Sequence, residues 1–250
     1  MKKYLFFIAG FIIVFLFISL QSPKIELRNV LIFTKTEGFR HESIKKGISA
    51  IKELGSQNGF AVFHTEDASF FNPSSLKKYQ SIIFLNTTGD ILNDEEQKNF
   101  EQYIQAGGGW VGIHSAADTE YKWPWYGQLV GAYFNGHPKI QNADLNVIEK
   151  SHPSTKKLPD LWNRKDEWYN YKFVNSNLNT TIKIDEGSYE GGTNGENHPI
   201  SWYHNHDGGN AFYTGLGHTT ESYQEKLFLD HILGGIFWSM GIEGSNQQIK

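Results

Sequence analysis

The sequence contains no cysteine, and this absence excludes several kinds of site at once. A thiol nucleophile, a disulfide framework, a zinc site with cysteine ligands and a lipoprotein anchor all need the missing residue. The chain also lacks any block of basic residues, and its formal net charge is −4. Nucleic acid is therefore not an expected partner.

One long uncharged run stands at the N-terminus. Lys2 and Lys3 precede the segment Tyr4 to Leu20, which is rich in Phe, Ile and Leu. This pattern is typical of a secretory signal or a signal anchor whose lysines stay inside. No Ala-x-Ala cleavage site follows, and the run would span about 26 Å as a helix, slightly short of a bilayer of about 30 Å. We expect an exported protein, periplasmic or at the cell surface, in which residues 1–23 are either a cleaved signal peptide or a membrane anchor.

From residue 24 onward we expect one α/β domain. Short apolar runs alternate with helical patterns in the first half of the chain, and this rhythm predicts a doubly wound, mostly parallel sheet. A helix is predicted from His41 to Leu54, and Asn93 with Glu96 resembles a capping box. The second half is more elaborated, with shorter strands and a closing helix. The predicted strands are 28–33, 60–64, 81–85, 110–113, 144–149, 179–185, 200–204 and 210–214, and the closing helix is 224–240.

Four polar clusters follow predicted strands, and a functional cleft is expected where they meet. Parallel sheets bind their ligands at the carboxyl ends of the strands. Each cluster alone also has a structural interpretation, because His41 and Asn86 could cap helices and Asp90 could shape a turn. The clusters are Arg40–Glu42, Asn86–Asp90, His114–Glu120 and His218–Glu221.

The glycines from Gly107 to Gly112 formally match the dinucleotide-binding pattern G-x-G-x-x-G. That motif must follow a strand and open a helix, whose N-terminus holds the pyrophosphate. Here the glycines precede the strand, so the match is a false positive. The same segment instead predicts a buried strand that delivers His114 at its carboxyl end.

Further histidines and carboxylates lie in the second half. Imidazole and carboxylate groups bind zinc and similar ions, and they also act as general acids and bases. We favour Glu167 and His198 for function, and interpret His152 as a turn residue and the His204/His206 pair as part of a solvated loop. Trp125 and Trp168 could stack on a sugar, although core packing is the usual role of tryptophan.

Six longer motifs resemble the ThuA-like (trehalose-utilisation) family, and the resemblance covers about residues 28–241. It implies a class I glutamine amidotransferase-like, flavodoxin-related fold. It also implies a role in carbohydrate metabolism, where relatives are linked to trehalose and to oxidised (3-keto) disaccharides. The motifs are FTKTEGFRH (33–41), LNTTGD (85–90), GIHSAADTE (112–120), DEWYN (166–170), HPISW (198–202) and GLGHT (215–219).

The comparison with amidotransferases implies a changed site. Those enzymes place a cysteine on a strained turn and pair it with a later histidine; here His114 resembles the first position and His218 the second, with Glu221 nearby. Thioester chemistry is lost because the nucleophile is absent. Ser115 is not a convincing substitute, since adjacent residues at a strand end point apart. The chain is therefore not expected to be a functional amidotransferase.

Two mechanisms remain open for an enzyme acting on a disaccharide or its keto derivative. In one, His114, His218 and either Asp118 or Glu167 bind a divalent metal such as zinc. In the other, the same groups act without metal as general acid and base. A non-catalytic sugar-binding or accessory protein at the cell surface is the alternative. The expected catalytic residues are His41, His114, Asp118, Glu167 and His218, and the expected substrate-binding residues are Arg40, Asn86, Asp90, Glu120, Trp125, Trp168 and His198.

Overall fold

Apolar runs in the first half of the chain form parallel strands, and the central ones are mostly buried. The computed structural model describes residues 28–242. Strands β1 (Arg28–Phe33), β3 (Ser81–Leu85) and β4 (Gly109–Ile113) lie at the centre, and β2 (Phe60–Thr65) pairs with the outer side of β1. The order β2-β1-β3-β4, followed by β11, is that of flavodoxin-like folds. The expected α/β fold is confirmed.

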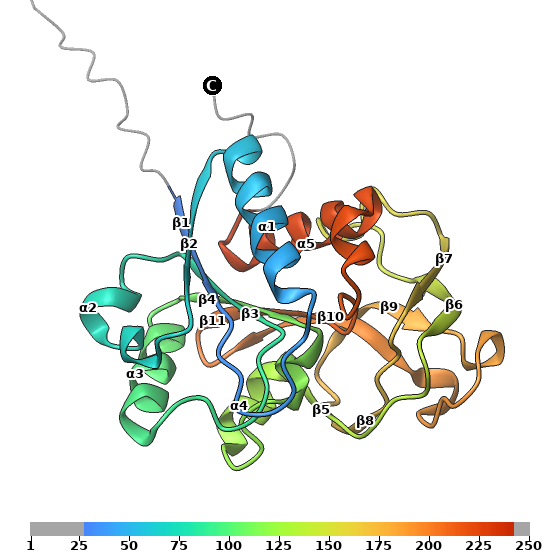
Figure 1. The fold of residues 1–250 in the computed structure, drawn as a ribbon, viewed down its shortest axis with the longest axis horizontal. Coiled ribbons are helices and arrows are strands. Elements are labelled where there is room, and N and C mark those ends of the chain that lie inside the picture. Colours follow the sequence, from blue (N-terminus) through green and yellow to red (C-terminus); the bar gives the residue numbers. More distant parts are fainter. Residues whose placement is uncertain (1–27, 243–250) are drawn as a thin grey trace, which may run out of the picture.

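Helices cover both faces of the parallel strands (Figure 1). Helices α1 and α5 contact one another on one face, while α3 and α4 lie on the other. The capping box of α3 is present, because the Asn93 side chain accepts from the backbone of Glu96 and the Glu96 side chain accepts from that of Asn93. The helices are α1 (Ile44–Asn58), α2 (Pro73–Leu76), α3 (Asp94–Gln105), α4 (Pro124–Val130) and α5 (Lys226–Ser239).

The first helix begins three residues later than the sequence predicts. Ser43 precedes it without capping it, because its hydroxyl donates to the carbonyl oxygen of Gly217 at 3.3 Å and accepts from Asn86 at 2.9 Å. His41 consequently lies in the turn before α1, where its ring is free to join the site. The helix ends at Gly59, which adopts a left-handed conformation with φ 74°.

The second half adds an antiparallel extension to the same sheet. Strand β11 returns beside β4 in parallel, and the order then continues β10-β9-β6-β7, all antiparallel to their neighbours. Two short strands, β5 and β8, pair separately. The bounds are β5 (Ala132–Phe134), β6 (Gln141–Val147), β7 (Leu161–Asp166), β8 (Tyr171–Val174), β9 (Asn179–Ile184), β10 (Pro199–His206) and β11 (Gly209–Thr214).

The sequence did not predict β7, and its burial pattern explains why. Trp162, Arg164 and Asp166 are its buried residues, so two of the three inward side chains are charged. Arg164 and Asp166 form an ion pair at 3.1 Å, and Trp162 donates to Glu225 at 2.8 Å. The edge strand therefore curls back against the segment just before α5.

The interpretation of His204 and His206 as part of a solvated loop was wrong. Strand β10 continues through His206, and only 5% of His204 is exposed. His152 lies in a turn, as expected, and its Nδ1 accepts from the backbone N–H of Ser154 at 3.2 Å.

No helix within residues 28–242 is long and apolar enough to cross a membrane. The N-terminal run that suggested a signal or an anchor lies outside these residues.

Candidate metal centre

His114 occupies a strained turn directly after β4. Its φ of 51° is in the left-handed region, which a non-glycine residue seldom adopts without compensation. Its Nδ1 lies 2.9 Å from the carbonyl oxygen of Gly215, and Tyr213 donates to its carbonyl oxygen at 2.7 Å. Because a carbonyl can only accept, Nδ1 carries the proton. In this tautomer, Nε2 presents its lone pair to its neighbours.

His218 and Glu167 converge on that nitrogen from the other half of the chain. His114 Nε2 lies 3.1 Å from His218 Nδ1 and 3.3 Å from Glu167 Oε2, and the last two atoms are 3.1 Å apart. All three side chains are at least four-fifths buried. The strand ends after β4, β7 and β11 thus deliver one atom each to a single point.

There are too few protons for these three atoms to form a complete set of hydrogen bonds with one another. His114 Nε2 and Glu167 Oε2 are both acceptors when the imidazole is neutral, and His218 Nδ1 has at most one proton to share between them. A cation at the centre would satisfy all three. Ligand atoms at a tetrahedral zinc ion lie about 3.3 Å apart, given metal–ligand distances of about 2.0 to 2.1 Å, and the observed separations match this spacing.

His41 provides a fourth side chain. One ligand atom from each of the four residues His41, His114, Glu167 and His218 lies within 4.8 Å of the other three. The His41 ring stands edge-on to the rings of His114 and His218, at 5.0 Å between centroids in each case. Burial, with the neighbouring imidazoles, lowers the pKa of His41 to about 2. It therefore stays neutral at physiological pH, as a metal ligand must.

The carboxylate and His218 are held in complementary charge states. Burial alone would raise the pKa of Glu167, but the hydrogen bond from His218 and the adjacent imidazole of His114 hold that pKa well below its usual range. Burial opposes charging of His218, and the hydrogen bond and charge of Glu167 outweigh it, so the pKa of His218 is raised. Without a metal, the pair shares a proton; with one, that proton would be displaced.

A second layer of contacts orients the ligands. His137 Nδ1 is 3.1 Å from Glu167 Oε1, the carboxylate oxygen other than the one beside His114. The fully buried carboxylate of Asp166 accepts from the backbone N–H groups of Glu167, Gly217 and His218, at 3.0, 2.8 and 3.1 Å. Such outer contacts fix ligand geometry and raise metal affinity. The residues present therefore fit a divalent metal of the zinc class.

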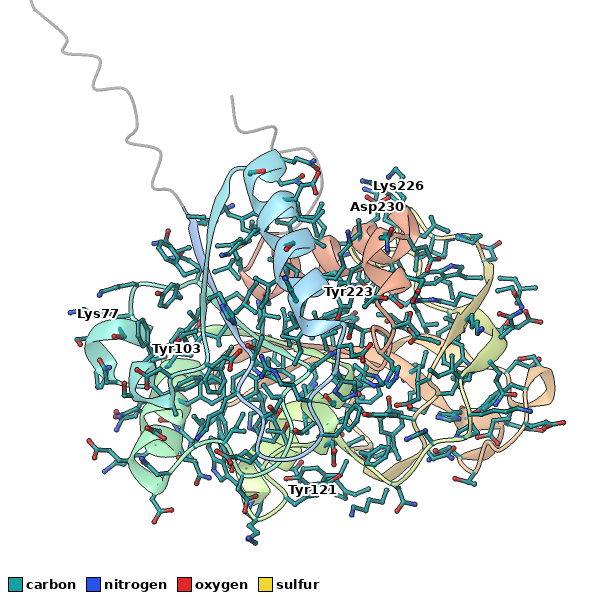
Figure 2. The ribbon with its side chains drawn as sticks, in the orientation of Figure 1. Lys77, Tyr103, Tyr121, Tyr223, Lys226 and Asp230 are labelled. Carbon is teal, nitrogen blue, oxygen red and sulfur yellow. The ribbon has the colours of Figure 1, made fainter. Side chains whose placement is uncertain are left out.

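The loop that carries His218 is also supported from behind. Tyr223 donates to the carbonyl oxygen of Gly217 at 3.2 Å and is buried between α1 and α5, where Figure 2 labels it. Gly47 on α1 lies so close to the Tyr223 ring that an added Cβ would sit 2.9 Å from it. The packing of α1 therefore bears directly on the position of the loop.

The family model described as trehalose utilisation, ThuA, matches residues 29–239. The chain belongs to the ThuA family. This membership gives it a place in carbohydrate metabolism, and it confirms the resemblance noted from the sequence motifs.

Solved structures of ThuA-family relatives share the fold. A ThuA-like protein from Bacteroides uniformis ATCC 8492 is 25% identical, with a TM-score of 0.72 over 85% of this chain and 91% of that one. A ThuA-like protein from Parabacteroides merdae ATCC 43184 is 21% identical, with a TM-score of 0.73 over 89% and 93%. No curated protein matches the chain.

The fold also recurs inside larger enzymes. A cold-adapted β-galactosidase from Rahnella sp. R3 is 13% identical and has a TM-score of 0.58 over 87% of this chain and 32% of its own. At this identity the likeness concerns the fold alone.

Four of the five expected catalytic residues come together in the structure, namely His41, His114, Glu167 and His218. The fifth, Asp118, ends the 3-10 helix η2 (His114–Asp118) that follows β4. Its Oδ1 accepts from the hydroxyl of Tyr121 at 2.6 Å, and Figure 2 shows Tyr121 at the lower edge of the molecule. Burial raises the pKa of Asp118, against the opposing effects of Tyr121 and His114.

Several expected substrate-binding residues have structural partners instead of a place in the cluster. Glu120 is 1% exposed, and its carboxylate accepts from the backbone of Ile91 and Leu92, each at 2.8 Å. Asn86, also at positive φ, donates to Ser43 and to the carbonyl oxygen of Gly217. It thereby ties β3 to the loop of His218.

The two remaining polar candidates of the first half form surface ion pairs. Asp90 pairs with Lys122 at 2.8 Å. Arg40 pairs with Glu66 at 2.5 Å, and both line a cavity of about 490 Å³ that also borders His41.

The two tryptophans and His198 lie away from the cluster. Trp168 is fully buried and donates to the carbonyl oxygen of Gln141 at 2.9 Å, whereas Trp125 donates to Asp207 at the same distance. His198 is buried beside Glu186 at 2.7 Å, and its Nε2 lies 2.8 Å from the carbonyl oxygen of Tyr169. The Tyr169 ring lies 4.2 Å from the His114 ring between centroids, so Tyr169 connects His198 to the site.

Sequence reasoning missed the orienting residues His137 and Asp166. Asp166 begins the motif DEWYN (166–170), which by itself states no role for it. Asp166 gave no clear signal, because two of the three buried side chains of β7 are charged and the strand lacks hydrophobic periodicity. His137 gave none, because its partner Glu167 lies 30 positions away in the sequence.

Proposed function

We propose that the chain is an exported, metal-dependent enzyme that acts on a disaccharide or its keto derivative. The observation that carries this proposal is the convergence of His114 Nε2, His218 Nδ1 and Glu167 Oε2 to mutual distances of 3.1 to 3.3 Å. A non-catalytic sugar-binding protein has no need of three buried ligand atoms around one point, because burying unpaired polar atoms costs free energy.

The four residues of the cluster would hold the ion, and the remaining groups would act on the substrate. A bound divalent ion would polarise a sugar carbonyl or activate a water molecule. His137 holds Glu167 in position, and Asp166 holds the backbone of His218.

Asp118 would move the proton. It lies one turn beyond His114, and its raised pKa brings it closer to neutral pH, which favours exchange with a substrate hydroxyl or C–H group. The Tyr121 hydroxyl donates to Oδ1 and so orients the carboxylate. Oδ2 is thereby left as the oxygen for the reacting proton.

The proposal is tested by product analysis. Full-length protein without an affinity tag is incubated with trehalose, sucrose, maltose and their 3-keto derivatives, and the products are identified by mass spectrometry. We expect turnover of at least one keto derivative, a loss of about a hundredfold or more in His114→Ala and His218→Ala, and near-normal turnover in His206→Ala. Full turnover after chelation would support metal-free chemistry instead. Binding without any product would establish an accessory role and contradict the proposal.

A further inference from the structure

Phe39 is unusually exposed for an aromatic residue beside a polar site. It is 66% exposed, more than any other large hydrophobic side chain among residues 28–242. An aromatic ring left exposed forgoes the favourable free energy of burying its apolar surface. Single exposed apolar residues are common and need no explanation by themselves. The surroundings of Phe39 provide one.

The backbone around Phe39 is fixed. Glu37 donates its backbone N–H to the carbonyl oxygen of Thr88 at 2.8 Å, and Gly38 donates to the Thr88 hydroxyl at 3.2 Å. The same hydroxyl donates to the carbonyl oxygen of Phe39 at 3.0 Å. Thr88, in the loop after β3, therefore fixes the backbone of the loop that carries Phe39. Because this backbone is already ordered, a ligand that contacts the ring loses little conformational entropy on binding.

The ring stands next to the candidate metal centre. Phe39 and His41 are two residues apart on the loop, and their rings meet edge-on at 4.9 Å between centroids. The His41 ring in turn lies 5.0 Å from those of His114 and His218. Arg40, between them, is paired with Glu66. Phe39 is thus an exposed apolar ring in contact with His41, one of the four residues of the candidate metal centre.

We propose that Phe39 is the platform on which a pyranose ring of the substrate stacks. A pyranose has an apolar C–H face and a rim of hydroxyl groups, so it suits a site in which a flat apolar ring adjoins imidazole and carboxylate groups. This inference rests on the proposed function and specifies how that site recognises its substrate. It assigns Phe39 to substrate affinity and not to metal binding or to the chemical step.

The test compares Phe39→Ala with Phe39→Trp and with Phe173→Ala. Phe173 is a matched control, because it is 54% exposed on β8 and has no ring contact with the histidine cluster. Binding of trehalose and of its 3-keto derivative to the zinc-loaded full-length protein is measured by calorimetry. We expect Phe39→Ala to weaken binding about five- to tenfold, Phe39→Trp to retain it, and Phe173→Ala to leave it unchanged. Zinc content and melting temperature should stay at wild-type values in all three.

The outcomes separate this inference from the proposed function. If Phe39→Ala binds both sugars as tightly as wild type while His114→Ala loses turnover, the platform is refuted and the enzyme proposal stands. If Phe39→Ala loses affinity although no variant or wild-type protein forms product, the platform stands and the enzyme proposal fails. Absence of sugar binding by the wild type overturns both. A kcat effect without a KM effect in Phe39→Ala would also contradict the assignment.

Discussion

At the scale of single residues, Asp118 is the side chain whose chemistry can be tested most simply. Its pKa is raised from the ordinary value of 3.8, chiefly by burial. If the ionised carboxylate is the catalytic base, activity is present above this pKa and is lost as the pH falls through it. The acid limb of the pH profile should therefore lie at higher pH than an ordinary aspartate would give.

Asp118→Asn should lower kcat about a hundredfold and remove that acid limb. The profile is measured with zinc saturating, so that protonation of the ligands does not contribute, and the zinc content should match wild type. Asp90→Asn is the matched control, because Asp90 pairs with Lys122 at the surface. An unchanged acid limb in Asp118→Asn would show that another group is the base.

Most residues of the cluster were identified from the sequence, but their contacts in the folded protein were not. The abrupt change from an apolar strand to His114 marked the elbow, and the motif order paired it with His218. Glu120 looked equally suitable, yet its carboxylate caps the backbone at Ile91 and Leu92. Nothing in the local sequence distinguishes a carboxylate that binds backbone N–H groups from one that faces a ligand, because the partners come from elsewhere in the fold.

At the scale of elements, the end of β7 determines where His218 lies. Asp166 accepts from Gly217 and His218 in the loop after β11, and Ser222 donates to Asp166 at 3.2 Å. Arg164 donates to Ser222 at 2.8 Å and completes the buried set. Outer contacts of this kind change metal affinity by about 10- to 100-fold.

Ser222→Ala should therefore weaken zinc binding about tenfold, and Asp166→Asn should weaken it further. Thr220→Ala is the control, since its hydroxyl contacts only the exposed Glu221 in the same segment. Competition with a chelating dye gives the affinities, and melting temperatures verify that each variant is folded. If Asp166→Asn does not fold, the Ser222→Ala variant still tests the prediction. If folded Ser222→Ala protein binds zinc as tightly as wild type, the hydrogen bonds of Ser222 and Asp166 do not orient His218 for metal binding.

The elements themselves were predictable to different degrees for physical reasons. Strands β3 and β4 are buried along their length, as are the last four residues of β1, so their sequences are mainly apolar, and the sequence predicted them closely. Strand β7 buries Arg164 and Asp166, whose charges satisfy each other only after folding. Hydrophobic periodicity cannot detect such a strand.

At the scale of the whole molecule, the site joins the two halves of the chain. His41 and His114 come from the parallel half, whereas Glu167 and His218 follow β7 and β11 of the elaborated half. The curled extension of the sheet, whose strand β7 lies near the start of α5 (Figure 1), places Glu167 Oε2 3.3 Å from His114 Nε2. This curvature depends on contacts between distant strands, so the local sequence could predict the parallel core but not the meeting of the two halves.

The measurement that tests the central claim most directly is a calorimetric titration of the untagged, metal-free protein with zinc. The geometry predicts one tight zinc equivalent, with release of about one proton because His218 and Glu167 share one in the free site. It also predicts loss of that equivalent in His114→Ala and in Glu167→Gln, with His206→Ala unchanged. Absence of tight zinc binding in the wild type, or wild-type binding in folded His114→Ala and Glu167→Gln proteins, would contradict a metal centre at these four residues.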